Sequence, residues 1–174
     1  HFETSHTVPT WLEQQIDSTK KRVILHPKSQ GSAVEWGVQH FAELGEKLAS
    51  ENYQVFYTGT EKEAESFSHL IPENCVDTTG KLTLDELIAF IQRVDILVAA
   101  STGPLHIAGL LNRGALGLFS PRRPIHPGRW MPLGNHSTTL VHDENCTICK
   151  SGKACDCVSK IEVEGVLSAI LSLE

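Results

Sequence analysis

The stretch Asp95-Ile-Leu-Val-Ala-Ala-Ser-Thr-Gly-Pro-Leu-His-Ile-Ala-Gly109 joins a strand, a tight turn and the start of a helix. Its first part is an apolar run that ends in small residues, which predicts a buried parallel strand. Gly103 permits a tight turn, and Pro104 suits the first helical position because its φ is already helical. The sequence therefore predicts a helix N-terminus at the carboxyl edge of a parallel sheet.

Such a helix start is suited to an anion, because its backbone N–H groups are free and the helix dipole is positive there. His106 lies in the first turn, so its ring can reach the same anion. Alternatively, Gly103 and Pro104 serve only the turn and His106 caps or packs. We favour a site for a phosphate-bearing ligand, since ligands of such sheets bind outside the carboxyl ends of the strands.

Short apolar runs alternate with helical patterns along the rest of the chain. This alternation predicts an α/β fold with a doubly wound, mostly parallel, Rossmann-like sheet of five or six strands. We expect the turns after the strands to meet at one edge of the sheet. The expected strands cover residues 23–25, 53–57, 75–76, 95–98, 116–119 and 138–141, and the expected helices 38–49, 61–70, 84–91 and 163–170. The loops expected at the ligand edge are 28–33, 58–63, 80–82 and 101–106.

Composition narrows the function classes. The chain has 174 residues, 40% of them hydrophobic, which is enough for one domain with a good core. Its net charge of −6 argues against nucleic acid as a partner. No apolar run reaches the length of a membrane span, and the first residues lack a signal-peptide core. With five cysteines, an odd number, we expect a reducing, cytoplasmic setting.

Several further motifs follow one another in a fixed order and carry a family resemblance. They are Val23-Ile-Leu-His-Pro27, Trp36 with Phe41-Ala-Glu-Leu44, Thr58-Gly59-x-x-x-Glu63, Thr79-Gly80-Lys-Leu-Thr-Leu84-Asp-Glu-Leu87, Thr102-Gly103-Pro104-Leu-His106-Ile-Ala-Gly109 and Gly114-Ala-Leu-Gly-Leu-Phe119-Ser-Pro121. In order and spacing they resemble glycosyltransferase family 9, the ADP-heptose:lipopolysaccharide heptosyltransferases. The resemblance covers about residues 22–172.

The resemblance implies the C-terminal half of a GT-B glycosyltransferase. Residues 1–20 are then an interdomain connector, and residues 21–174 form the Rossmann-like domain that binds the nucleotide-sugar donor. The implied function is transfer of a sugar, heptose, from a nucleoside-diphosphate sugar similar to ADP-heptose to a lipopolysaccharide or other cell-envelope acceptor. The acceptor domain and the catalytic base belong to an N-terminal half that this chain lacks, so we expect the chain alone to be inactive.

The same resemblance implies where the enzyme works and what its helix start binds. The full-length enzyme would be cytoplasmic, as a peripheral protein of the inner membrane, and would require no cofactor. Thr102, Gly103 and His106 would contact the donor pyrophosphate. Ser101 stands beside them, in the place of the family's aspartate.

Other candidate contacts come from three more loops. By resemblance, Glu63 holds the ribose hydroxyls, Leu82 meets the adenine, and Ser29 and Ser32 contact phosphate. Each also has a purely structural interpretation. Glu63 would stabilise its helix, and Leu82 would pack beside the capping box that Thr83-x-x-Glu86 predicts for the next helix. The small residues of the first loop would form a solvated turn.

Two departures from the family pattern favour a second hypothesis. Val34 occupies the position of the family's pyrophosphate-binding lysine, and Ser101 that of its aspartate. Lys28 is a candidate substitute for the missing lysine. A degenerate, non-catalytic nucleotide-binding or interaction module is therefore the alternative function. An NAD enzyme is disfavoured because no Gly-x-Gly-x-x-Gly follows the first strand.

Four of the cysteines lie close together near the C-terminus, as Cys146, Cys149, Cys155 and Cys157. Four thiolates are a common ligand set for structural zinc. The Cys-x-Cys pair is not the usual Cys-x-x-Cys knuckle, so we favour thiols that lie apart from one another. A zinc site and a disulfide formed after purification are the alternatives.

Overall fold

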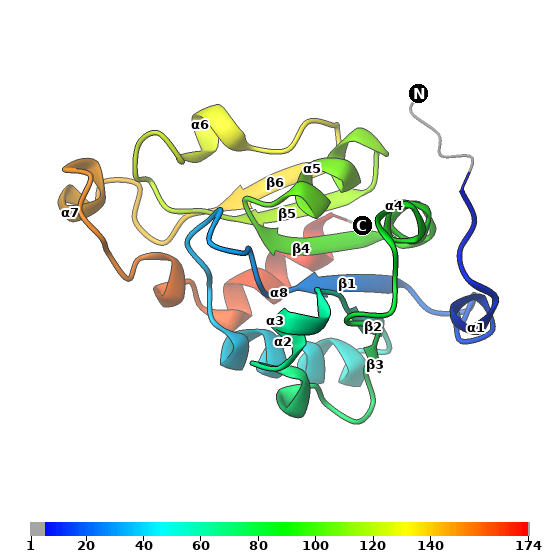
Figure 1. Ribbon diagram of the computed structural model, residues 1–174. Helices are drawn as coiled ribbons and strands as arrows, with labels where there is room; N and C mark the ends of the chain where they lie inside the picture. Colours follow the sequence, from blue (N-terminus) through cyan, green and yellow to red (C-terminus); the bar gives the residue numbers. More distant parts are fainter. Residues whose placement is uncertain (1–5, 174) are drawn as a thin grey trace.

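The computed structural model describes residues 6–173, which form one sheet with helices on both faces (Figure 1). Six parallel strands lie in the order β3-β2-β1-β4-β5-β6. This order confirms the predicted doubly wound α/β fold, with its switch point between β1 and β4. The strands are β1 (Arg22–His26), β2 (Gln54–Tyr57), β3 (Val76–Asp77), β4 (Ile96–Ala100), β5 (Gly114–Leu118) and β6 (Ser137–Leu140).

The helices cover the sheet in two groups. The helices α2 and α8 contact each other against one face, and α4 and α5 do so against the other. The helical segments are α1 (Thr10–Glu13), α2 (Val38–Ser50), α3 (Glu61–Ala64), η1 (Ser68–Leu70), α4 (Leu84–Arg93), α5 (Gly103–Leu110), α6 (Pro127–Trp130), α7 (Thr147–Lys150), η2 (Val158–Lys160) and α8 (Val163–Ser172).

Alternation along the central strands builds two separate cores. In β1, Val23 and Leu25 point into the core under α2 and α8, while Ile24 points into the core under α4 and α5. All three side chains are fully buried. A sheet buried on both faces needs apolar residues at every position, which explains the continuous apolar runs of its strands. Trp36 lies in the first core, as expected for a packing residue.

One expected helix is shorter than its pattern. The helix predicted over residues 61–70 ends at Ala64, and a separate 3-10 turn follows at Ser68–Leu70. Phe67, between them, leaves helical geometry at φ −144° and is buried 6.5 Å from the ring of Tyr57. Burial of this aromatic ring therefore overrides the local helical pattern.

Two segments outside the main helices contain short helical turns. Residues 1–5 of the expected connector lie outside the described residues, and the rest of it contains the single turn α1, anchored by the buried Leu12. The loop between β5 and β6 contains the short helix α6. Among residues 6–173, no helix combines the length and the apolar character that a membrane crossing requires.

Helix α5 makes a close backbone contact that only glycine allows. A Cβ on Gly109 would overlap the carbonyl oxygen of Leu133 and lie 3.1 Å from Pro132, whereas a Cβ on Gly103 meets nothing within 4 Å. We therefore expect Gly109→Ala to lower the free energy of unfolding by about 1–3 kcal/mol, despite alanine's better helix propensity. Urea unfolding would measure this, with Gly103→Ala as the matched control on the same helix. Wild-type stability in Gly109→Ala would contradict the contact.

Candidate functional site

The four loops expected at the ligand edge line one cavity of about 680 Å³ at the carboxyl ends of β1, β2 and β4. The cavity lies at the switch point between β1 and β4, where doubly wound sheets bind ligands. Of the sequence candidates, its wall includes Ser29, Ser32, Glu63, Leu82, Thr102 and Gly103. The first loop, the Glu63 loop, the Leu82 loop and the start of α5 therefore face a common space.

The start of α5 brings an unusual group to this wall. Thr102 is the N-cap residue of α5, yet its side chain makes no capping hydrogen bond. Its hydroxyl is buried and has no hydrogen-bond partner among the described residues. A buried polar atom without a partner is costly, which marks it for a ligand or an ordered water. Pro104 lies in the first turn, as predicted from sequence.

Ser101 and His106 line a second cavity of about 370 Å³. This cavity shares Ser32, Thr102 and Gly103 with the first, so the two spaces meet at the start of α5. Burial lowers the pKa of His106 from its ordinary value, so the ring is neutral at pH 7.

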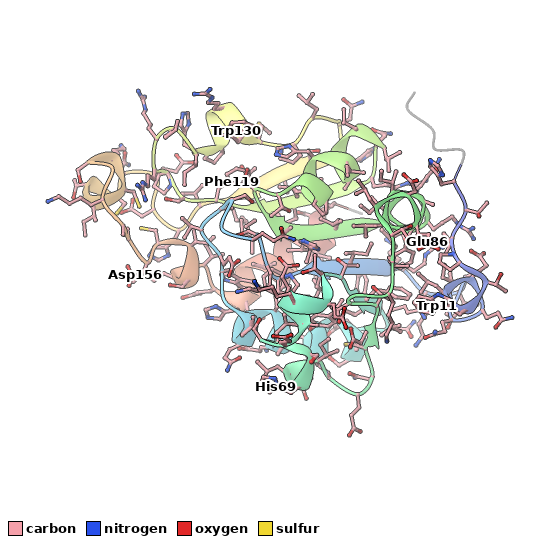
Figure 2. The ribbon with its side chains drawn as sticks, in the orientation of Figure 1. Trp11, His69, Glu86, Phe119, Trp130 and Asp156 are labelled. Carbon is pink, nitrogen blue, oxygen red and sulfur yellow. The ribbon has the colours of Figure 1, made fainter. Side chains whose placement is uncertain are left out.

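Helix α6 forms the far wall of this second cavity, with Trp130 above α5 (Figure 2). The ring centroids of Trp130 and His106 lie 6.4 Å apart. The space beside His106 is therefore bounded by an aromatic ring.

Glu63 has the structural role expected from the sequence and also lies in the cavity wall. Its Oε2 accepts hydrogen bonds from the backbone N–H of Thr60 at 2.8 Å and from the Thr60 hydroxyl at 3.0 Å. The backbone N–H of Glu63 donates to Thr60 Oγ1, which completes a capping box. The same carboxylate is 9% exposed and lines the cavity. Glu63 therefore stabilises α3 and faces the ligand space.

The Leu82 loop is tied to the Glu63 loop by glycine. Gly80 has φ +69°, and its N–H donates to the carbonyl oxygen of Gly59 at 2.9 Å. A Cβ on Gly80 would lie 3.0 Å from the backbone of Glu61. Leu82 is half-buried against the core under α4 and also lines the cavity. It therefore packs and faces the ligand space at once.

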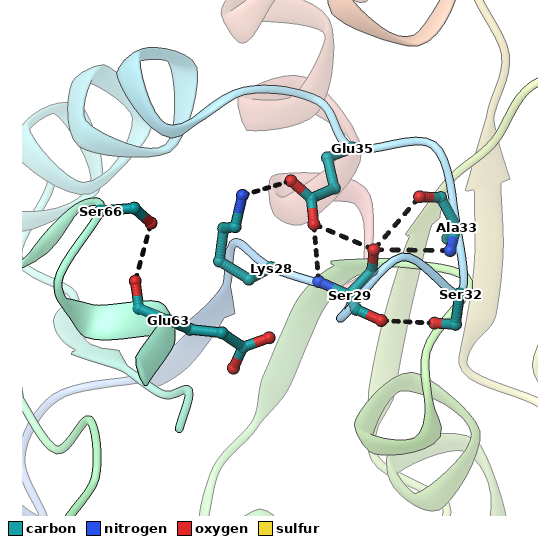
Figure 3. A network of polar contacts seen from close by, with 7 residues as sticks. All are labelled: Lys28, Ser29, Ser32, Ala33, Glu35, Glu63 and Ser66. Carbon is teal, nitrogen blue, oxygen red and sulfur yellow. Dashed lines mark hydrogen bonds and ion pairs between the residues drawn. The ribbon is translucent and has the colours of Figure 1, made fainter. Parts of the chain in front are cut away.

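Glu35, which sequence reasoning missed, organises the first loop (Figure 3). Its carboxylate accepts hydrogen bonds from the Ser29 N–H and hydroxyl, both at 2.9 Å, and pairs with Lys28 at 2.6 Å. These hydrogen bonds and the Lys28 charge hold the pKa of Glu35 below its usual value despite partial burial. Ser32 donates to the Ser29 carbonyl oxygen. Lys28, the candidate to replace the family's pyrophosphate-binding lysine, forms an ion pair with Glu35. Val34, which occupies the position of that lysine, packs against the core.

His26 is a second cavity residue that the sequence analysis did not select. It ends β1, and its Nδ1 lies 2.8 Å from Thr58 Oγ1. Burial lowers the pKa of His26, and the charge of Glu63 partly opposes that shift. The ring is therefore neutral at pH 7. The only sequence signal was its place at the carboxyl end of an apolar strand, which also suits a core histidine.

The expectation that the cysteine thiols lie apart is wrong. The sulfur atoms of Cys146, Cys149, Cys155 and Cys157 all lie within 4.8 Å of one another. The chain brings them together because α7 and the turn before η2 fold back on each other. This group could hold a metal ion. Among the described residues, 6–173, none of these four cysteines lines either of the two cavities at the start of α5.

The chain is similar in sequence to two curated heptosyltransferases. The chain is 26% identical to the lipopolysaccharide core heptosyltransferase OpsX of Haemophilus influenzae, over 78% of this chain and 40% of that protein. It is 32% identical to lipooligosaccharide heptosyltransferase 2 of the same organism, over 63% of this chain and 33% of that protein. The chain thus spans less than half the length of these relatives.

Solved structures share the fold. The ADP-heptose lipopolysaccharide heptosyltransferase II of E. coli superposes with a TM-score of 0.76 at 22% identity, over 93% of this chain and 49% of that one. E. coli heptosyltransferase WaaC with ADP superposes with a TM-score of 0.67 at 15% identity, over 96% of this chain and 46% of that one. The iron-containing heptosyltransferase TibC of enterotoxigenic E. coli was solved in complex with ADP-D-beta-D-heptose. It superposes with a TM-score of 0.66 at 16% identity, over 88% of this chain and 45% of that one.

The family model for glycosyltransferase family 9 (heptosyltransferase) matches residues 4–158, most of the chain. The match includes the loops that line the cavity and all four clustered cysteines. The chain therefore belongs to glycosyltransferase family 9, the heptosyltransferase family.

Proposed function

We propose that residues 21–174 are the donor-binding domain of a glycosyltransferase that transfers heptose from a nucleoside-diphosphate sugar to a lipopolysaccharide-type acceptor. The observation that carries this proposal is the unpartnered Thr102 hydroxyl at the start of α5, in the wall of the 680 Å³ cavity. A cavity of this size suits a ligand as large as a nucleotide sugar.

The donor would lie across the switch point of the sheet. Its diphosphate would accept hydrogen bonds from the Thr102 hydroxyl and the first N–H groups of α5. The second carboxylate oxygen of Glu63 would accept from the ribose hydroxyls, and Leu82 would contact the base. His106 would lie beside the diphosphate at the start of α5, and the sugar would extend past Ser101 into the adjoining cavity.

The geometry of α5 also suits the departure of the nucleoside diphosphate. Negative charge grows on the leaving diphosphate as the bond to the sugar breaks. The helix dipole and N–H groups are already oriented toward that charge, so they stabilise it without reorganisation.

Solved relatives with ADP and with ADP-D-beta-D-heptose support an adenine nucleotide sugar as donor. The names of the curated relatives support a lipopolysaccharide or lipooligosaccharide acceptor. In this proposal, the acceptor domain and catalytic base lie in the part of the relatives that this chain does not span. The full-length enzyme would act in the cytoplasm, at the surface of the inner membrane.

The proposal assigns no metal to the transfer step. Any ion held by the four cysteines would be structural, and zinc is the ion that we propose. The cysteine group and the donor cavity have separate walls, as far as residues 6–173 describe them.

A non-catalytic nucleotide-binding module is the second candidate. It is favoured by one observation: the place of the family's lysine is Val34, which packs on the core, and Lys28 is paired with Glu35. Because no lysine is among the described residues of the two cavity walls at α5, affinity would depend on α5 and Thr102. Binding of a nucleotide is common to both candidates, whereas transfer in the full-length enzyme belongs only to the first.

Thr102→Val tests the binding role without disturbing the fold. Removing a buried hydroxyl that lacks a partner should leave the stability of the free protein unchanged or raise it. Loss of a hydrogen bond to a charged diphosphate should cost about 1.5–3 kcal/mol, hence about tenfold or more in the Kd for ADP. Isothermal titration with ADP, UDP and GDP would measure this. Wild-type affinity in Thr102→Val would contradict the assignment, and no binding of any nucleotide would overturn the donor site.

Glu63→Gln should weaken ADP binding for a different reason, because an amide is a poorer acceptor for two ribose hydroxyls than a carboxylate. The same change also weakens a capping box. Glu86→Gln is the matched control, since Glu86 forms the equivalent box with Thr83 at the start of α4 and lies outside the cavity walls described. Calorimetry should show weaker binding in the first variant only. Equal losses in both variants would assign the effect to helix stability.

Affinity for a nucleotide sugar should rise as the pH falls from 8 to 6. Burial lowers the pKa of His106 in the free protein, and a nearby diphosphate would raise it, so binding takes up a proton. Each unit of that rise can add up to about tenfold in affinity at low pH. ADP-glucose is the suitable probe because its pyrophosphate does not titrate in this range. His106→Gln should flatten the profile, and an unchanged slope would exclude His106.

A further inference from the structure

We propose that Cys146, Cys149, Cys155 and Cys157 bind one zinc ion as four thiolates. Their sulfurs already lie within 4.8 Å of one another, with 3.6 Å between Cys146 and Cys155 and 3.3 Å between Cys155 and Cys157. In a tetrahedral site with Zn–S bonds of about 2.3 Å, the sulfurs lie about 3.8 Å apart. Adjustments of about 1 Å or less would therefore complete the site.

The local backbone also suits a metal knuckle. Cys146 is the N-cap residue of α7, and Cys149 lies within its single turn. Residues three apart in a helical turn lie on the same side of it, which places the two side chains next to each other. Gly152, with φ +80°, turns the chain back toward Cys155. The Cys-x-x-Cys pair thus begins a knuckle, and the Cys-x-Cys pair closes it from the other side.

A polar residue outside the group supports it as an outer-shell partner. The hydroxyl of Ser120 donates to the sulfur of Cys149 at 3.4 Å, and both residues are buried. Ser120 also accepts from the backbone N–H of Arg122 at 3.1 Å and lies just after β5. Outer-shell hydrogen bonds orient metal ligands and are part of a built site. The ion would therefore fasten this segment to the end of the sheet.

The segment between β6 and α8, which contains the four cysteines, has little regular structure to hold it in place. It extends beyond the carboxyl ends of β5 and β6 at the left of Figure 1, and its only regular elements there are the single turns α7 and η2. Helices this short are unstable alone. The segment and the loop after β5 together enclose a further cavity of about 570 Å³, with Arg123, Glu144 and Lys150 in its wall. A bound ion would hold that wall in place.

Zinc is preferred to iron on chemical grounds. A tetrahedral set of four sulfurs suits either ion, but divalent zinc binds a given site more tightly than divalent iron. No two of the sulfurs are joined in a disulfide, which would need about 2.05 Å between them, and all five cysteines are free thiols.

Metal analysis of the protein purified without chelators tests the proposal. We expect one zinc per chain by plasma mass spectrometry, and one Co²⁺ per chain with the strong visible absorption of a tetrahedral thiolate site after exchange. Cys149→Ser should lower the metal content at least tenfold. Cys75→Ser is the matched control, because Cys75 lies outside the group, and it should keep one zinc per chain.

The remaining outcomes are equally decisive. Purified wild-type protein that takes up neither zinc nor cobalt, with five thiols reactive in denaturant, would overturn the site. One iron per chain would overturn the choice of zinc. Ser120→Ala keeps all four ligands, so it should retain zinc but release it faster to a chelator, and an unchanged rate would remove Ser120 from the site. These measurements need no nucleotide, so they stand or fall independently of the donor proposal.

Discussion

The pairing of β1 with β4 is the constraint on which the candidate site depends. These strands are neighbours in the sheet although β2, β3 and the helices between them separate the two in the chain. They pair in register from Val23 with Ile96 to His26 with Ala99. The chain leaves β1 toward one face of the sheet and β4 toward the other. The loops after the two strands therefore separate and leave an open crevice. Every candidate contact is attached to the rim of that crevice.

If the crevice binds a diphosphate as we propose, the free protein carries a cost at one group of its rim. A threonine at an N-cap normally hydrogen-bonds to the first turn of its helix, but Thr102 leaves that role unfilled. Around the rest of the rim, polar groups are satisfied internally. His26 pairs with Thr58, Ser29 with Glu35, and Glu63 with Thr60. This contrast supports the proposal that the Thr102 hydroxyl contacts the ligand.

Local patterns predicted what depends on local physics. The Gly103–Pro104 helix start, the capping box of α4 and the parallel order of the strands follow from turn chemistry and apolar runs. The early end of α3 did not, because burial of Phe67 depends on residues distant in the chain. The role of Glu35 was missed because a glutamate in a loop resembles a solvated charge. The cysteine sulfurs meet only because the backbone folds back between them, which spacing alone does not determine.

The double duty of Glu63 has a consequence for how this domain can diverge. Its carboxylate caps α3 and faces the cavity, so a substitution there changes folding and ligand recognition at once. A lineage that changes its ligand at this position must first acquire stability elsewhere, whereas the half-buried Glu86, outside the cavity wall described, can change under the single requirement of capping. Coupled demands on one side chain slow its replacement. The crevice should thus keep its acidic rim long after other surfaces have changed.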